Sequence, residues 1–319
     1  MEARGSDGVD HWQLLRSAAE LTDQLVAGGQ SLTFGLGVRG QLVQQLPSEA
    51  ALRWESGMGW QSLLPKDDPG HELLQLYLPL CSAHSRQPMT IGHLGQSLDG
   101  FIATSSGESC FVTGPANIVH LHRLRALSDA VIVGVGTVAT DNPRLTTRLV
   151  TGRNPMRVIL DPHRRLKADR TVFRDGAADT IRVSLRTSVP IPSDAAIREL
   201  QVGGKAGHLD LSELLAWLHA QGCARILVEG GGVTVSRFLQ DGLFDRLHLA
   251  VAPLLIGSGR RGLQMPAAGA LADRMRLLPQ VHRMGDDTLF DCPLRSRPGA
   301  EAALPATPEA RTHFLVGSG

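Results

Sequence analysis

The chain has 319 residues, of which 42% are hydrophobic and 4% aromatic, enough for one large or two medium globular domains. Its 32 basic and 31 acidic residues are well mixed and leave a formal net charge of +1. That balance argues against nucleic acid or an anionic membrane as the main partner. No apolar run approaches the ~18 residues of a membrane span, and the first residues lack a signal-peptide core, so we expect a cytoplasmic protein.

Residues 1–85 differ in composition from the rest of the chain. They hold three of the four tryptophans and the only tyrosine, Tyr77. Helical spacing of apolar residues predicts one helix over 11–29, ending on two glycines, and a second, shorter helix over 72–83. We expect an N-terminal extension of unassigned role, joined to the remainder of the chain by a linker at 85–90.

From residue 89 onward, short apolar runs alternate with stretches of helical periodicity. This alternation predicts an α/β domain with a mostly parallel sheet flanked by helices. The expected strands are 89–97, 130–135, 156–161, 180–185, 224–229 and 246–256. The expected helices are 117–128, 211–222 and 233–242. The Pro- and Ala-rich tail, 293–319, is expected to be disordered.

Three consecutive glycines follow the predicted strand 224–229, directly after Glu229. Ligands of open α/β sheets bind at the carboxyl ends of strands, and Gly230–Gly232 would present bare amides to an anion at the next helix start. A dinucleotide pyrophosphate suits such a place. A tight turn without a ligand is the alternative, because the run fits neither the G-x-G-x-x-G nor the P-loop pattern.

Three further stretches extend this observation: SLDGFIATSSGESCFVTG (97–114), AVIVGVGTVATDNPRLTTR (130–148) and AVAPLLIGSGRRGL (250–263). Together with VEGGG they resemble the reductase domain of the bacterial riboflavin-biosynthesis deaminase/reductase, a dihydrofolate-reductase-like fold, over residues 88–292. The resemblance implies NADPH-dependent reduction of 5-amino-6-(5-phosphoribosylamino)uracil to its ribitylamino product. It also implies a small phosphorylated heterocycle as substrate and a homodimer.

Matching motifs carry the family's site residues onto this chain. The substrate contacts implied are Ser109, Arg125, Leu145, Arg148 and Glu229. The cofactor contacts implied are Gly95, Phe111, Thr137, Asp141, Gly231, Gly232, Val233, Thr234, Val235, Ser236 and Arg237. Asp99 is the candidate catalytic residue, to place substrate or relay a proton.

Each of these residues also has a plainer interpretation. Asp99 could cap a turn, and Glu229 could face a helix start. Arg125 could be a solvated cation, as Arg123 beside it is expected to be. His120 and His122 are expected to be ordinary helix residues. Arg164 and Arg165 could recognise the 2′-phosphate of NADPH or form a solvated basic turn.

The sequence departs from the family pattern in three respects. The H-x-E and P-C-x-x-C of the zinc deaminase are missing, which excludes deamination and predicts no metal. Phe111 stands where tryptophan is usual, and Phe101 where a basic residue is common. The alternatives are therefore a reductase of a pterin-like or secondary-metabolite heterocycle, or a non-catalytic NADP-binding regulatory protein.

The four scattered cysteines predict buried or half-buried thiols rather than disulfides.

Overall fold

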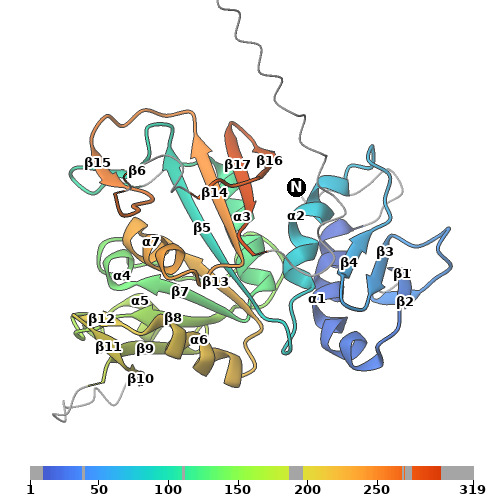
Figure 1. Ribbon diagram of the computed structural model, residues 1–319, viewed down its shortest axis with the longest axis horizontal. Coiled ribbons are helices and arrows are strands. Elements are labelled where there is room, and N and C mark those ends of the chain that lie inside the picture. The colour runs from blue at the N-terminus through green and yellow to red at the C-terminus, as the bar shows by residue number, and fades with distance from the viewer. Residues whose placement is uncertain are drawn as a thin grey trace, which may run out of the picture.

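The computed structural model describes residues 10–37, 40–109, 112–186, 197–267, 269 and 275–295. The predicted fold class is confirmed, because a nine-stranded, mostly parallel sheet lies between helices, with a small N-terminal extension beside it (Figure 1). None of the described helices is long and apolar enough to cross a membrane. The predicted tail falls mostly on residues 296–319, outside the described residues.

The N-terminal extension, residues 10–85, forms a unit that we call the N-terminal unit. Its helices are α1 (His11–Gly28) and α2 (His71–Cys81), which confirms both predicted helices. The Asp10 side chain caps α1 by accepting a hydrogen bond from the amide of Gln13, and Gly29, with φ of +67°, ends the helix. The unit also contains a four-stranded antiparallel sheet that was not predicted, in the order β2-β1-β3-β4. Its strands are β1 (Leu32–Leu36), β2 (Leu42–Gln44), β3 (Leu52–Glu55) and β4 (Gly59–Ser62).

The large sheet has the order β10-β9-β8-β7-β13-β5-β14-β17-β16, and only its last two strands run antiparallel to their neighbours. The parallel strands are β5 (Met89–Ser97), β7 (Ala130–Gly134), β8 (Met156–Leu160), β9 (Thr180–Leu185), β10 (Arg198–Val202), β13 (Arg225–Glu229) and β14 (Arg246–Ala252). The antiparallel strands are β16 (Gln280–Met284) and β17 (Asp287–Pro293). All six predicted strands are therefore present, although the last stops at Ala252.

Two small pairs of strands lie outside the large sheet. One joins β6 (Phe101–Thr104) to β15 (Gly259–Arg261), and the other joins β11 (Gly204–Lys205) to β12 (His208–Leu209). The helices of this part are α3 (Pro115–Leu127), α4 (Val135–Asp141), α5 (Thr171–Arg174), α6 (Leu211–Ala220) and α7 (Gly232–Gln240). The three predicted helices correspond to α3, α6 and α7.

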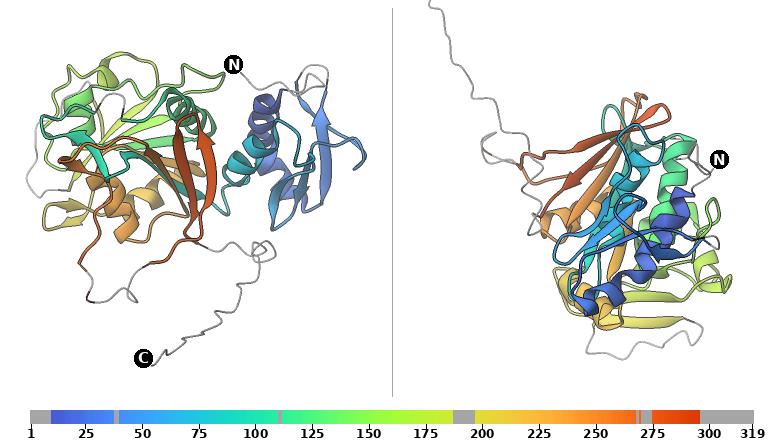
Figure 2. Two further views of the ribbon diagram at one scale, coloured as in Figure 1. Left: turned by 90° about the horizontal axis from the view of Figure 1, so that it is seen from above. Right: turned by 90° about the vertical axis from the view of Figure 1, so that its right-hand side faces the viewer.

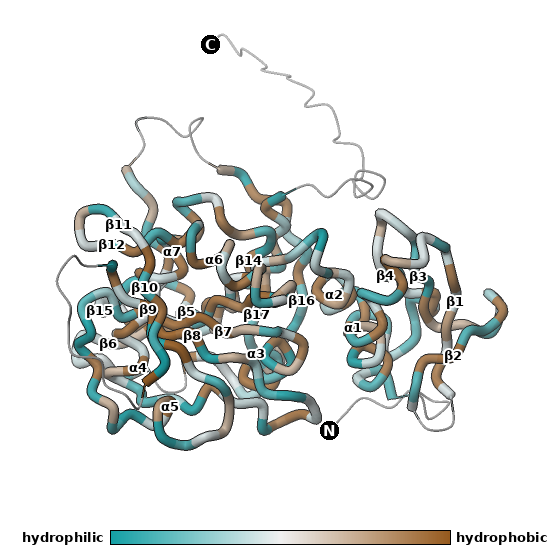
Figure 3. The backbone as a smooth tube through the Cα atoms, turned by 90° about the horizontal axis from the view of Figure 1, so that it is seen from below, coloured by the Kyte–Doolittle hydropathy of each residue, from teal (hydrophilic) through white to brown (hydrophobic). Residues whose placement is uncertain are grey.

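Alternating residues of the central strands enter two separate cores. On β7, Val131 and Val133 join the cluster that includes α3 and the N-terminal unit, whereas Ile132 joins the cluster of α6 and α7. Both faces of the sheet are covered, which explains the continuous apolar runs of its strands (Figure 3). Cys81, Cys223 and Cys292 are buried free thiols, as predicted.

Candidate active site

The glycine turn between β13 and α7 lies at the carboxyl edge of the sheet, beside the turn between β7 and α4. Gly230 has φ of +76°, a conformation that other residues rarely adopt. A methyl group on Gly232 would lie 2.1 Å from the carbonyl oxygen of Gly262, so this glycine permits a close backbone approach. A methyl group on Gly231 would meet only Thr137 Oγ1, at 3.4 Å. Two of the glycines therefore serve the fold, and the third has only the hydroxyl of Thr137 beside it.

The side chains of α7 have different surroundings. Val235 is fully buried in the core, and the hydroxyl of Ser236 accepts a hydrogen bond from the amide of Gln264 at 2.8 Å. Val233 is 75% exposed, and Arg237 pairs with Asp241. The first-turn amides of a helix have no acceptor within the helix, so those of Gly232 and Val233 are the groups α7 offers to an anion. Thr234 faces Gly134 across the two turns.

Arg125 on α3 and Glu229 at the end of β13 form a buried, two-pronged ion pair. Nε donates to Oε1 and Nη2 to Oε2, each at 2.7 Å. Nη1 donates to the carbonyl oxygen of Thr146 at 3.2 Å. This geometry excludes a solvated Arg125, and it directs the arginine to a carboxylate rather than to open space for a phosphate.

The loop after α4 brings Arg148 close to this pair. Burial, followed by the charges of Arg125 and Arg144, lowers the pKa of Arg148, whose side chain remains exposed. The amide of Arg148 donates to His122 Nδ1 at 3.0 Å. Leu145 is fully buried and has φ of +56°, a left-handed conformation that is unusual for leucine. Among the predicted substrate residues, Arg125, Arg148 and Glu229 thus gather at one place.

His122 lies on α3, as expected, and it also contacts the Arg148 loop. It is buried, and burial followed by the charges of Arg125 and Arg148 lowers its pKa to about 4. The neutral ring accepts from Arg148 through Nδ1 and therefore carries its proton on Nε2. Sequence reasoning missed this residue because the periodicity of α3 alone does not show what lies opposite it.

Asp99 follows β5 in the turn closed by Gly100. Its carboxylate accepts from the Ser97 hydroxyl at 2.5 Å and from the amide of Gly257 at 2.6 Å. The amide of Ile256 lies 3.1 Å from the same carboxylate. These hydrogen bonds, that of Ser97 first, lower the pKa of Asp99. These hydrogen bonds indicate that Asp99 anchors the 254–257 loop rather than donates a proton.

The remaining predicted residues lie around this edge. Ser109 Oγ is 3.4 Å from Asp141 Oδ1 across the site. Gly95 faces Thr113, whose methyl group would meet a Cβ at 2.7 Å. Phe111 lies outside the described residues. In the part of the chain that is described, no group of three or more His, Cys, Asp or Glu side chains could hold a metal.

Phe101 has a cation over its ring. The guanidinium carbon of Arg261, on the neighbouring strand β15, lies 5.3 Å from the ring centre. The carbonyl oxygen of the same arginine is close to Gly232, so Arg261 joins β6 to the glycine turn. A cation therefore lies over the ring of Phe101, although position 101 itself carries no charge.

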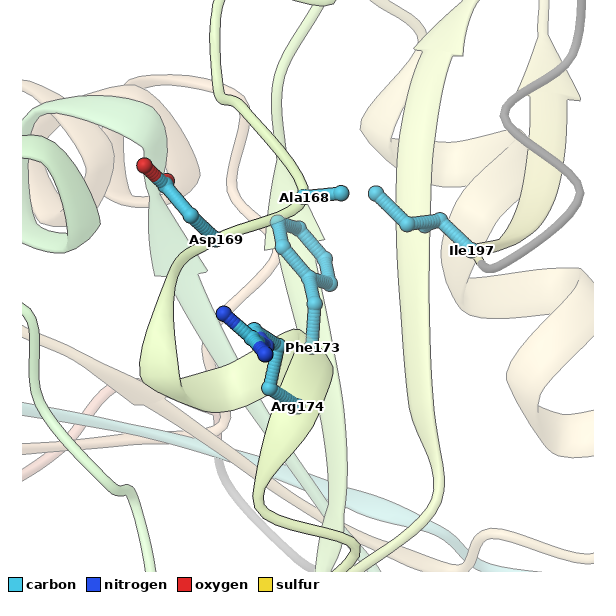
Figure 4. A pocket seen from close by; sticks show the side chains of 5 residues that line it. All are labelled: Ala168, Asp169, Phe173, Arg174 and Ile197. Carbon is cyan, nitrogen blue, oxygen red and sulfur yellow. The ribbon is translucent and has the colours of Figure 1, made fainter.

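A separate hollow of about 280 Å³ lies near α5 and β10 (Figure 4). None of the predicted site residues lines it. Its lining residues are Ala168, Asp169, Phe173, Arg174 and Ile197. Nearby, Arg164 is bound to Glu199, while Arg165 remains exposed, so only Arg165 of this pair is free of a carboxylate partner among the described residues.

This chain is similar in sequence to reductases and RibD proteins of riboflavin biosynthesis. The 2,5-diamino-6-ribosylamino-4(3H)-pyrimidinone 5′-phosphate reductase of Methanothermobacter thermautotrophicus is 34% identical over 214 residues, which are 64% of this chain and 97% of that protein. The riboflavin biosynthesis protein RibD of Escherichia coli is 32% identical over 61% of this chain and only 56% of its own length. The chain therefore spans about half of the RibD proteins it matches.

Solved structures agree with the sequence relatives. The deaminase/5-amino-6-(5-phosphoribosylamino)uracil reductase of Thermotoga maritima is 26% identical, with a TM-score of 0.55 over 70% of this chain and 60% of that one. The model of the RibD C-terminal domain family matches residues 88–288. This chain belongs to the RibD C-terminal domain family and is an oxidoreductase of the riboflavin-pathway type.

Proposed function

We propose that residues 88–292 catalyse the NADPH-dependent reduction of a ribosylamino group to a ribitylamino group on a 5′-phosphorylated aminopyrimidine. The first substrate we propose is 5-amino-6-(5-phosphoribosylamino)uracil. The observation that carries the proposal is the Arg125–Glu229 pair with Arg148 beside it, at the same sheet edge as the open glycine turn. On one side of this edge, Glu229 can accept hydrogen bonds and Arg148 supplies a cation. On the other side, the glycine turn supplies backbone amides.

The glycine turn fits a nicotinamide dinucleotide. Gly231 carries no side chain, and the hydroxyl of Thr137 lies beside Gly230 and Gly231, just before the first amides of α7. We propose that these groups hold the diphosphate, with Ser109 and Asp141 nearby. A bound nicotinamide supplies the hydride that adds to C1′ of the opened, imine-like ribose. NADPH rather than NADH is proposed from the family, with Arg165 as the free cation for a 2′-phosphate.

The substrate half assigns different roles to its two arginines. Arg125 has three of its N–H groups committed to Glu229 and Thr146, so we propose that it aims Glu229. Glu229 then accepts hydrogen bonds from pyrimidine amino groups or ribose hydroxyls. Arg148 is exposed and lies next to this pair, so we propose that it binds the 5′-phosphate by charge-assisted hydrogen bonds.

The ring substituent at C2 separates two possible substrates. The relative from Methanothermobacter is named for the diaminopyrimidinone, whereas the Thermotoga enzyme is named for the uracil. Both compounds share the ribosylamino 5′-phosphate on which the proposal depends. A pterin-like heterocycle is the alternative, because Phe101 and its partner Arg261 alter the substrate side of the site.

The test is to mix purified protein and NADPH with each pyrimidine and follow the loss of nicotinamide absorbance. We expect turnover with at least one pyrimidine, and a large loss when the 5′-phosphate is removed from the substrate. NADPH binding without turnover of either compound would favour the pterin-like alternative. No binding of NADPH would overturn the proposal.

Two further proposals come from the family alone. We propose a homodimer, which sedimentation or light scattering of the purified protein tests directly. We also propose a cytoplasmic location, which cell fractionation with an antibody to this chain tests.

A further inference from the structure

The N-terminal unit is joined to the reductase by hydrogen bonds, two of them buried, rather than by a linker alone. Tyr77 Oη lies 2.5 Å from His120 Nδ1, and both side chains are fully buried. Trp12 Nε1 donates to the carbonyl oxygen of Thr151 at 2.8 Å. Arg225 Nη1 donates to the carbonyl oxygen of Ala19 at 2.9 Å. Apolar residues of both parts belong to one continuous core.

These three contacts end on the elements that carry the predicted substrate residues. His120 lies on α3 with Arg125, and Thr151 lies in the loop of Arg148. Arg225 begins β13, the strand that ends at Glu229. The helices of the cofactor side, α4 and α7, lie at the far side of the reductase from the N-terminal unit (Figure 1 and Figure 2). The N-terminal unit therefore contacts α3, the Arg148 loop and the start of β13, but neither α4 nor α7 through these hydrogen bonds.

A chain of neutral rings continues the Tyr77 contact into the sheet. His120 Nε2 lies 3.0 Å from His248 Nδ1, and His248 Nε2 lies 3.2 Å from Asp291 Oδ1. The Asp291 carboxylate favours the proton of His248 on Nε2, so His248 accepts from His120 and His120 accepts from Tyr77. The Tyr77 hydroxyl is thus the donor that completes the chain. Without it, a buried ring nitrogen of His120 would lose its partner.

The α3 helix and the Arg148 loop are also fastened to each other. The Arg148 amide is bound to His122, and a methyl group on Gly152 would lie 2.5 Å from Ala126 Cβ. Arg123, which was expected to be solvated, has its guanidinium 5.7 Å from the Trp12 ring centre. A shift of α3 would therefore move Arg125 and the loop together.

We infer that the N-terminal unit is a positioning module for the substrate half of the site, with Tyr77 and Trp12 as its positioning residues. It holds α3 and the Arg148 loop from outside, so that Arg125, Glu229 and Arg148 keep their mutual geometry. The kinetic part of this inference rests on the proposed function. The structural part, that the unit braces these two elements, does not.

The experiment uses the full-length protein and two variants, Tyr77→Phe and Trp12→Phe, each of which removes one hydrogen-bond donor at the interface and keeps an aromatic ring. Trp60→Phe is the matched control, because it removes the buried donor to Thr22 Oγ1 (2.8 Å) inside the N-terminal unit. We expect the interface variants to raise the KM for the phosphorylated pyrimidine roughly 3- to 30-fold. The Kd of NADPH stays within about twofold of wild type. The control leaves both values unchanged.

Hydrogen–deuterium exchange is measured on the same proteins, so that the bracing is tested even if wild type turns over neither pyrimidine. We expect Tyr77→Phe to speed exchange in 115–127 and 142–154 but not in 232–240. Trp60→Phe speeds exchange only within the N-terminal unit. Equal effects of the interface and control variants on KM, a parallel loss of NADPH affinity, or unchanged exchange in 115–127 would overturn the inference.

Discussion

The guanidinium of Arg125 and the carboxylate of Glu229 meet edge to edge through two 2.7 Å hydrogen bonds, with side-chain exposures of 7% and 5%. The two residues are 104 positions apart in the chain. Their pairing joins α3, which contacts the N-terminal unit, to the end of β13, where the glycine turn begins.

Removing one member of this pair leaves a buried charge without its partner. Arg125→Met and Glu229→Leu, made singly, are each expected to lower the free energy of unfolding by about 3–5 kcal/mol. The double variant is expected to recover much of this loss, because two apolar side chains then face each other. Denaturant titration measures the stability. The double variant should still have a high KM for the substrate, because both side chains of the pair are absent. A double variant whose loss of unfolding free energy equals the sum of the two single losses would contradict the account.

Gly232 has no room for a side chain. In Gly232→Ala the methyl group would lie 2.1 Å from one backbone oxygen and 2.4 Å from another. We expect the β15 segment or the start of α7 to move, with weaker NADPH binding measured by titration calorimetry. Gly136→Ala, in α4, is the control, because a methyl group there meets nothing within 4 Å. Equal NADPH affinity in the two variants would contradict this account of the turn.

Arg148 and Arg261 are both exposed cations, and we have proposed that each lies on the substrate side of the site. Because a hydrogen bond to a charged group contributes about 1.5–3 kcal/mol, Arg148→Leu should raise substrate KM about 10- to 100-fold. Arg261→Leu should raise the substrate KM less, because the guanidinium of Arg261 is already engaged with the ring of Phe101. Arg186→Leu, which removes the partner of Glu213, is the control. Steady-state kinetics separates the three, and an unchanged KM in Arg148→Leu would remove the phosphate role.

Asp99 is expected to act through the 254–257 loop and not through its proton. Its pKa is lowered, so it is a carboxylate at neutral pH and cannot donate. Asp99→Asn should lower the melting temperature while the pH profile of kcat/KM keeps its shape. Loss of one limb of that profile would restore Asp99 as a proton-transfer residue.

The buried histidines predict a stability that falls with acid. Burial lowers the pKa of His93 to about 4, that of His120 well below its usual value, and that of His248 below its usual value. As pH falls, the histidines of the unfolded chain bind protons near pH 6.5, before those of the folded protein do. The free energy of unfolding is therefore at its full value above pH 6.5 and declines as pH falls toward 4. Each histidine adds about 1.4 kcal/mol per pH unit to the slope.

His120→Gln should flatten this slope, because one of the contributing rings is gone. His208→Gln, at an exposed position, should leave the slope unchanged. Denaturant titrations between pH 4 and pH 7 provide the measurement. A slope unaltered by His120→Gln would show that the ring is already protonated in the folded protein.

The large sheet was predictable because its parallel strands are covered on both faces and read as continuous apolar runs. Val131 to Val133 illustrate this, since alternate residues enter different cores. The sheet of the N-terminal unit was not predictable in the same way. Its strands have three to five residues with mixed polarity, as in β2, and only the completed unit buries Trp54 and Trp60.

The residues of the site were named from motifs, but their pairing depends on the fold. Nothing in the sequence near Arg125 indicates Glu229, and nothing near Phe101 indicates Arg261. The expectation of a solvated Arg123 was wrong for the same reason, because its partner Trp12 lies in the N-terminal unit, as does Tyr77, the partner of His120. Helical periodicity reports which face is buried, whereas partner identity requires the packed structure.

Transfer of a labelled hydride tests the central claim most directly. The protein is incubated with the phosphoribosylamino pyrimidine and NADPH carrying deuterium at C4 of the nicotinamide, with each C4 face labelled in turn. Mass spectrometry then locates the label in the product. We predict one deuterium on C1′ of a ribityl chain, from one of the two labelled faces, for each NADPH consumed. NADPH oxidation that leaves C1′ unlabelled with both forms would contradict the account.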